Sequence, residues 1–208
     1  MARSGVGGLF TPVSIPGKDD AMSHSRPHRY EMFDTAIGRC GLAWSPAGVC
    51  RVQLPERTET ATQERIARLG QPWHDDILPQ AIRQAVDAVS AFLAGEPQSF
   101  EAVALDLTGV SGFEADVYAA LREVRWGQTT TYGALAEAAG HAGLAQAVGN
   151  AMGRNPCPLI IPCHRVLAAG NRIGGFSAYG GWLTKTKLLE REGVLLRADR
   201  RDQLDLFT

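Results

Sequence analysis

Ile160-Ile161-Pro162-Cys163-His164-Arg165-Val166 is the stretch that best indicates how this chain folds and what chemistry it performs. The apolar run that leads into it, Leu159 to Ile161, predicts a buried strand, and Pro162 ends that strand because proline has no backbone N–H to donate. Free cysteine has a pKa of ~8.5, so a neighbouring histidine backed by a carboxylate is a common way to raise its thiolate fraction. Cys163 and His164 are therefore a candidate nucleophile and base. The alternative is a pair with no catalytic role, in which a buried thiol precedes a surface imidazole.

The composition is that of an ordinary globular protein. The chain has 208 residues, of which 45% are hydrophobic and 21% charged, and its formal net charge is -1. No apolar run approaches the ~20 residues of a membrane span, so we expect a cytoplasmic protein. Four cysteines are too few for a disulfide scaffold, and neither Cys40 nor Cys50 has the spacing of a zinc site, so we expect no metal. The charge argues against DNA binding by bulk electrostatics and favours few phosphate contacts.

The first half of the chain predicts a small α/β unit. Residues 1–28 are rich in Gly, Ser and Pro and predict a disordered leader, within which Met1 or Met22 could be the start. Short apolar segments separated by glycine and proline predict a β-meander over 33–37, 41–45 and 49–54. Residues 56–69 are charged and partly helical in pattern. Apolar residues at helical spacing predict a helix over 82–93 with Gly95 as its stop, and 100–107 reads as a strand or an extended linker.

From Ser111 onward the pattern becomes helical. A first helix is expected to end near 125–127, and Thr131 is a plausible N-cap for a short helix through Ala139. A second helix over 143–152 carries several small residues, and two short helices joined through glycine predict a helix-turn-helix. The small residues either let this helix approach another surface closely or serve tight helix packing.

A glycine-rich loop, 174–181, precedes a last helix over 182–192 that Gly193 stops. Such a loop can cradle phosphate, but no Lys-Ser or Lys-Thr follows it at Walker spacing. We therefore expect it to form one wall of a base pocket.

Several motifs share one resemblance. Pro162 to Val166 resembles the active-site signature of the O6-alkylguanine-DNA alkyltransferases, also called methylated-DNA–protein-cysteine methyltransferases. Further matching motifs occur in the family's order at 131–133, 147–152, 153–156, 180–181 and 188–193. The resemblance implies an α/β N-terminal domain of ribonuclease-H-like shape over 29–105, a mainly α C-terminal domain with a helix-turn-helix over 106–193, and a flexible tail over 194–208.

The resemblance also implies the chemistry. Cys163 would take an alkyl group from O6 of guanine in DNA and keep it as a thioether, so each molecule acts once and needs no cofactor. His164 would act as base through a bridging water, because neighbours on an extended strand point to opposite faces. By the same resemblance Glu192 orients the imidazole, Tyr132 donates to the guanine ring and Asn155 braces the active-site turn. The carbonyls of Cys163 and Val166 would accept from the guanine amine.

By resemblance, the second helix lies in the minor groove of duplex DNA, and the protein acts as a monomer. The implied DNA contacts are Thr131, Tyr132, Ala145, Gln146, Ala147, Gly149, Arg154 and Arg165. The implied pocket residues are Val166, Phe176, Ser177, Tyr179 and Gly180. The loop from Phe176 to Tyr179 is about two residues longer than the common version.

One position departs from the resemblance. A stacked base must be flipped out to react, and Gln146 stands where family members use an arginine to fill the vacated stack. Glutamine is shorter and uncharged, so a second reading is a lesion- or partner-binding paralogue with weak duplex repair.

The tail Gln203-Leu204-Asp205-Leu206-Phe207 resembles the motif by which bacterial repair proteins dock on the sliding clamp. Alternatively, its apolar residues fold back on the core.

Overall fold

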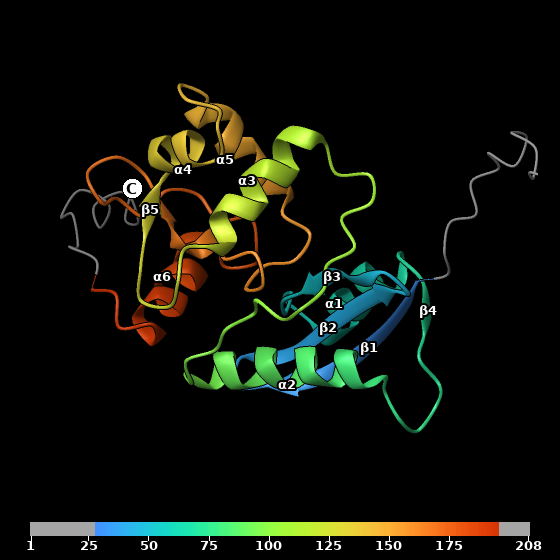
Figure 1. The fold of residues 1–208 in the computed structure, drawn as a ribbon. Coiled ribbons are helices and arrows are strands. Elements are labelled where there is room, and N and C mark those ends of the chain that lie inside the picture. Colours follow the sequence, from blue (N-terminus) through green and yellow to red (C-terminus); the bar gives the residue numbers. More distant parts are fainter. Residues whose placement is uncertain (1–27, 196–208) are drawn as a thin grey trace, which may run out of the picture.

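The computed structural model describes residues 28–195. The predicted leader, the choice of start site and the sliding-clamp motif therefore lie outside the described residues, as does nearly all of the predicted tail. Within the described range the chain has a sheet-containing first half and a helical second half (Figure 1).

The predicted β-meander is confirmed. Strands β1 (Arg29–Thr35), β2 (Gly38–Ser45) and β3 (Gly48–Gln53) pair antiparallel in sequence order. A short strand, β4 (Gln71–Pro72), adds to β1 in parallel, so the sheet order is β3-β2-β1-β4.

Two helices cover opposite faces of this sheet. Successive residues of a strand point to opposite faces, and β2 uses this alternation: Leu42 and Trp44 join the main core, whereas Ala43 faces a smaller cluster with Ile66. Ile66 belongs to α1 (Glu59–Ala67), and the main-core face is covered by α2 (Gln80–Ala94). Gly95 ends α2 with φ of 99°, a conformation that a side chain disfavours, which confirms the predicted stop.

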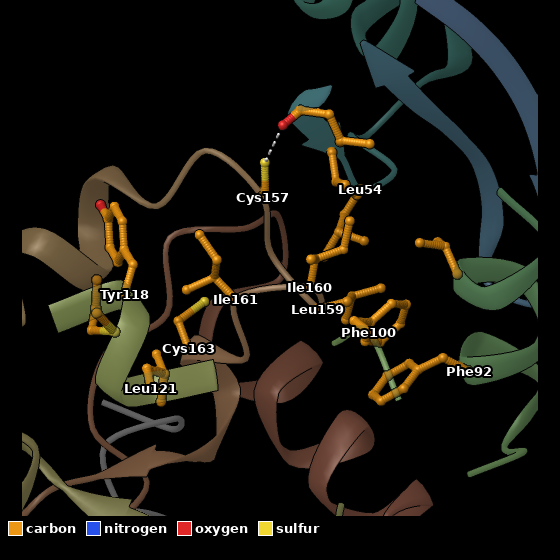
Figure 2. Packing of buried hydrophobic residues seen from close by; sticks show 14 of the residues in the cluster. Leu54, Phe92, Phe100, Tyr118, Leu121, Cys157, Leu159, Ile160, Ile161 and Cys163 are labelled. Carbon is orange, nitrogen blue, oxygen red and sulfur yellow. Dashed lines mark hydrogen bonds between the residues drawn. The ribbon is translucent and has the colours of Figure 1, made fainter. Parts of the chain in front are cut away.

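The segment 100–107 is an extended connection between the two halves rather than a full strand. Its bridge is between Val49 and Leu105, with Val49 N donating to Ala104 O at 2.9 Å. A second backbone bond, from Val52 N to Pro156 O at 3.0 Å, ties β3 directly to the helical half. One apolar cluster runs through both halves, and Figure 2 shows Phe92 and Phe100 of the first half with Leu159 and Ile160 of the second. The active-site turn therefore rests on the N-terminal sheet unit.

The helical half contains four helices among the described residues: α3 (Gly112–Arg122), α4 (Tyr132–Ala138), α5 (Ala145–Arg154) and α6 (Gly181–Arg191). Ser111 caps α3 in a reciprocal capping box with Glu114, and the Thr131 hydroxyl accepts from Ala134 N at 3.2 Å to cap α4 as predicted. Just before α4, β5 (Thr130–Thr131) pairs in parallel with β6 (Val166–Leu167). This pairing places the start of α4 beside the end of the active-site turn. No helix in the described part of the chain is long and apolar enough to cross a membrane.

Candidate active site

The predicted strand over 159–161 is wrong. Leu159 has φ of 75°, which no strand allows, and the run is a tight turn with a bridge from Pro158 to Ile161. After Pro162 the chain forms a single 3₁₀ turn, Cys163–Arg165. The apolar run is nevertheless buried, as expected. The sequence could not distinguish a buried strand from a buried turn here, because an apolar run this short shows no periodicity.

Asn155 holds this turn from α5. Its side-chain Nδ2 donates to Ile161 O at 2.8 Å, and its Oδ1 accepts from Cys157 N at 3.0 Å. The amide thus takes the place of a strand partner for backbone groups that would otherwise be buried without hydrogen bonds. The predicted bracing position of Asn155 agrees with this geometry.

His164, Arg165 and Glu192 form a buried network. Glu192 Oε1 lies 2.7 Å from His164 Nε2 and 2.9 Å from Arg165 Nη2, and Arg165 Nε lies 3.0 Å from both carboxylate oxygens. Burial raises the pKa of Glu192, but the bonds from His164 and Arg165 outweigh it and leave that pKa lowered. Burial lowers the pKa of His164 despite the Glu192 partner, so the imidazole is neutral and able to accept a proton.

The orientation of His164 leaves one nitrogen available. Nε2 is held by Glu192, whereas Nδ1 is buried and has no hydrogen-bond partner among residues 28–195. A buried polar atom of this kind generally has a partner, which can be ordered water. Cys163 and His164 lie on a 3₁₀ turn and not on a strand, so their side chains do not alternate between opposite faces as we expected. The unpartnered Nδ1 replaces that alternation as the reason to place a water there.

The position of Arg165 does not support its predicted DNA contact. Its side chain is only 6% exposed, and besides the Glu192 bonds its Nη1 donates to Val124 O at 2.5 Å. The Arg165 guanidinium therefore points into the protein, where it holds the Glu192 carboxylate that pairs with His164, and it is not placed to reach a phosphate.

Cys163 is buried at the edge of the apolar core (Figure 2). Burial raises the pKa of its thiol, and the Asn155 amide and the Lys185 ammonium partly offset that rise. A thiolate here needs a base and a nearby positive charge, and the site contains both.

Lys185 lies beside the site and was not predicted from the sequence. It is fully buried on α6, with Nζ donating to Val166 O at 2.6 Å and to Gly175 O at 3.2 Å. Burial lowers its pKa to about 8. The two bonds tie the glycine-rich loop to the end of the active-site turn. The periodicity could have revealed it, because Lys185 shares a helix face with Leu188, Leu189 and Glu192 at the spacing of a buried stripe.

A cavity of about 220 Å³ opens over Cys163. Tyr132, Phe176 and Ser177 line it as predicted, together with Gly149, Met152, Gly153 and Gly175. Tyr179 and Gly180 are absent from this lining: Tyr179 is 54% exposed, and Gly180 is the N-cap that precedes α6, with φ of 84°. Val166 is buried outside the lining, with its carbonyl already accepting from Lys185. Burial raises the pKa of Tyr132, so its hydroxyl keeps its proton and can donate it.

Five of the eight predicted DNA contacts lie on one open face. Thr131, Tyr132, Ala145, Gln146 and Gly149 line a hollow of about 610 Å³ that lies beside the Cys163 cavity and shares Tyr132 and Gly149 with it. Ala147 does not line this hollow, and Gln146 is exposed on α5. Arg154, whose Nε lies 2.6 Å from Glu114 Oε1, is exposed at the other end of the helix. No group of three or more metal-binding side chains occurs within residues 28–195.

Known proteins resemble this chain over most of its length. A sequence model described as 6-O-methylguanine DNA methyltransferase, DNA binding domain, matches residues 112–194. Proteins named methylated-DNA–protein-cysteine methyltransferase match from Mycobacterium tuberculosis, 36% identical over 82% of this chain and 95% of the relative, and from Mycobacterium leprae, 43% identical over 77% and 89%. The crystal structure of Mycobacterium tuberculosis OGT in complex with DNA has a TM-score of 0.64 at 34% identity, covering 81% of this chain and 96% of that one.

The names of these relatives fit the site of this chain, in which a buried cysteine lines a cavity and the next residue, His164, pairs with Glu192. The chain therefore belongs to the methylated-DNA–protein-cysteine methyltransferase family.

Proposed function

We propose that this protein repairs DNA by moving the alkyl group of an O6-alkylguanine onto Cys163. The observation that carries the proposal is the placement of the Cys163 thiol at the floor of a cavity, beside a neutral buried imidazole that Glu192 holds. Stoichiometric loss of O6-methyl groups from a duplex, matched by one methyl group per protein chain, would test it.

In the proposed transfer, residues of this chain take up and supply every proton, so no external reagent is needed. His164 takes the thiol proton through a water at Nδ1, the Cys163 sulfur attacks the alkyl carbon in line, and the C–O6 bond breaks. The electron pair of that bond returns to the guanine, which takes a proton from the Tyr132 hydroxyl on the cavity wall. The thioether is stable, so the protein is consumed.

Glu192 and Asn155 act on this step through other groups. Glu192 stabilises the charge that His164 gains when it accepts the proton, because the carboxylate is 2.7 Å from Nε2. Asn155 keeps the turn that aims the sulfur. Lys185 favours the thiolate by its charge and holds the Gly175 loop in place.

For DNA binding we infer that α4 and α5 act as a helix-turn-helix with α5 in the minor groove. The support is that α4 and α5 pack together, that Gly140 and Gly143 make the turn between them with positive φ, and that small residues line the open hollow. The ribonuclease-H-like shape of the first domain, its boundary near 105 and the monomeric state stay predictions.

Restoring an arginine in the flipping position is expected to accelerate duplex repair. Gln146→Arg should raise the rate on a duplex carrying O6-methylguanine several-fold, because a planar guanidinium fills the vacated stack better than an amide. The rate with free O6-benzylguanine should stay unchanged, since a free base needs no extrusion. Asn150→Arg, one turn further along the exposed face of α5, is the matched control for added charge.

Equal acceleration of both substrates, or of neither, would contradict the flipping argument. The same experiment addresses the paralogue with weak duplex repair as an alternative function. Relatives from Mycobacterium tuberculosis, Mycobacterium leprae and Mus musculus, each matched over most of its length, are named methylated-DNA–protein-cysteine methyltransferases, and this favours repair.

We also propose that the tail motif Gln203 to Phe207, which lies outside the described residues, docks on the DNA polymerase sliding clamp. The support is the sequence alone: Leu206 and Phe207 would anchor in an apolar pocket and Gln203 would set the register. Clamp tethering would raise the local concentration of the protein at DNA without phosphate contacts of its own. Titration of purified clamp should show binding by the full chain and none by a chain truncated after Asp202. Equal binding by both forms, or by neither, would refute the docking.

A further inference from the structure

A second hollow, which nothing in the proposed step uses, adjoins the Cys163 cavity. This hollow, about 100 Å³, lies between β3 of the N-terminal sheet and the loop 176–178. It shares Gly153, Cys163, Phe176 and Ser177 with the Cys163 cavity, so Cys163 borders both spaces.

The geometry of the transfer gives this hollow a role. In an in-line displacement the sulfur, the carbon and the leaving oxygen are collinear, and the other three substituents of the carbon spread sideways. Three hydrogens need no further room. A larger alkyl group must leave the line of attack laterally, and with guanine in the first cavity the second hollow is the space next to the sulfur.

One wall of this hollow carries a positive charge. Arg51 of β3 and Arg65 of α1 both line it, as does Glu56. Glu56 is engaged by Arg65 at 2.5 Å and by Gln53 Nε2 at 3.0 Å. Among residues 28–195, no carboxylate lies within ion-pair distance of Arg51. The lining therefore has a net charge of one positive unit, carried by the half-buried Arg51.

We propose that Arg51, on the wall of this hollow, makes the protein selective for O6-alkyl substituents that end in a carboxylate. A guanidinium pairs with a carboxylate through two parallel hydrogen bonds and does so more strongly when partly shielded from water. This inference rests on the proposed transfer and adds to it a residue that selects O6-carboxyalkylguanines over neutral O6-alkylguanines. The bonds that form and break stay the same, and Cys163 ends as an S-carboxyalkyl cysteine.

The test uses free bases first, because they carry no phosphate. Single-turnover rates are measured with O6-(4-carboxybenzyl)guanine and with its neutral isostere O6-(4-carbamoylbenzyl)guanine. The ratio of the two rates cancels differences in folding and in the fraction of active protein. We expect Arg51→Gln to lower this ratio by about fivefold, the effect of losing one partly screened ion pair. Arg51→Glu should lower it further, and Arg51→Lys should keep most of it.

Arg68→Gln is the matched control, because Arg68 is an exposed arginine at the end of α1 that does not line the hollow. Its ratio should equal that of the unchanged protein. The same ratio is then measured on duplexes carrying O6-carboxymethylguanine or O6-methylguanine, where the Arg51 variants should show the same order.

Three outcomes would overturn the inference. A carboxylate-to-carboxamide ratio that is unchanged in Arg51→Gln removes Arg51 from substrate selection. Equal slowing of both duplexes with no effect on the free bases would make Arg51 a phosphate contact instead. A protein that transfers nothing from either O6-benzylguanine or the methylated duplex would refute the proposed function itself, and this distinguishes that failure from the first two.

Discussion

The Cys163→Ala variant is expected to fold, to bind DNA and to lose all alkyl transfer. Alanine occupies less than the volume of the thiol at the edge of the core, and its methyl group has no lone pair with which to attack carbon. Gel-shift binding to a methylated duplex and a thermal melt should resemble those of the unchanged protein. The amount of methyl removed from the duplex should fall to background.

Cys157 provides the control for this result. It is buried in the same half of the chain, with its sulfur 3.9 Å from Val49 O, and burial raises the pKa of its thiol to about 12. A thiol with that pKa supplies almost no thiolate at neutral pH. Cys157→Ala should therefore retain transfer, and residual transfer by Cys163→Ala would place the nucleophile elsewhere.

Glu192→Gln is expected to cause the largest loss of stability among the site variants. The change leaves the buried Arg165 guanidinium without its counter-charge, and breaking a buried pair from one side costs about 3–5 kcal/mol. For a chain of this size each kcal/mol lowers Tm by about 2–4 °C. Transfer should slow as well, because His164 loses the carboxylate that stabilises its protonated form.

Asp116→Asn is the matched control for Glu192→Gln, since it breaks the exposed pair with His141. An exposed pair contributes at most about 1 kcal/mol. Denaturant unfolding at neutral pH should therefore separate the two variants clearly. Similar losses of stability in both would contradict the role assigned to the buried network.

The pH dependence of this difference follows from the lowered pKa of Glu192. A carboxylate with a lowered folded pKa contributes stability that is fully present above its unfolded pKa of ~4.3 and is lost as pH falls through the folded value. The gap in unfolding free energy between the unchanged protein and Glu192→Gln should be constant near neutral pH and should shrink below that unfolded value.

Local patterns predicted much of this fold. The glycine and proline punctuation of the first half predicted β1 to β3, and the capping residue Thr131 placed the start of α4 at its observed position. The side chains lining the cavity also follow the prediction at Tyr132, Cys163, Phe176 and Ser177. These predictions are correct because a turn residue, a helix cap or a short motif determines the structure of only a few neighbouring positions.

The misses have a different origin. The turn at Leu159 depends on Asn155 and on packing against the sheet, and the inward direction of Arg165 depends on Glu192, which follows 27 residues later. The second hollow needs β3 and the loop 176–178 to lie together. Long-range contacts decide each of these, and no local pattern encodes them. Lys185 is the exception, because its helical spacing from Leu188, Leu189 and Glu192 could have predicted that it is buried.

The most direct measurement of the central claim is peptide mass spectrometry after mixing the protein with an equal amount of duplex carrying one O6-methylguanine. Proposed transfer to Cys163 predicts one added methyl group on the peptide that contains Cys163, an equal amount of restored guanine, and no further repair when a second portion of duplex is added. An unmodified Cys163 peptide, or a methyl group found on the Cys157 thiol instead, would contradict it.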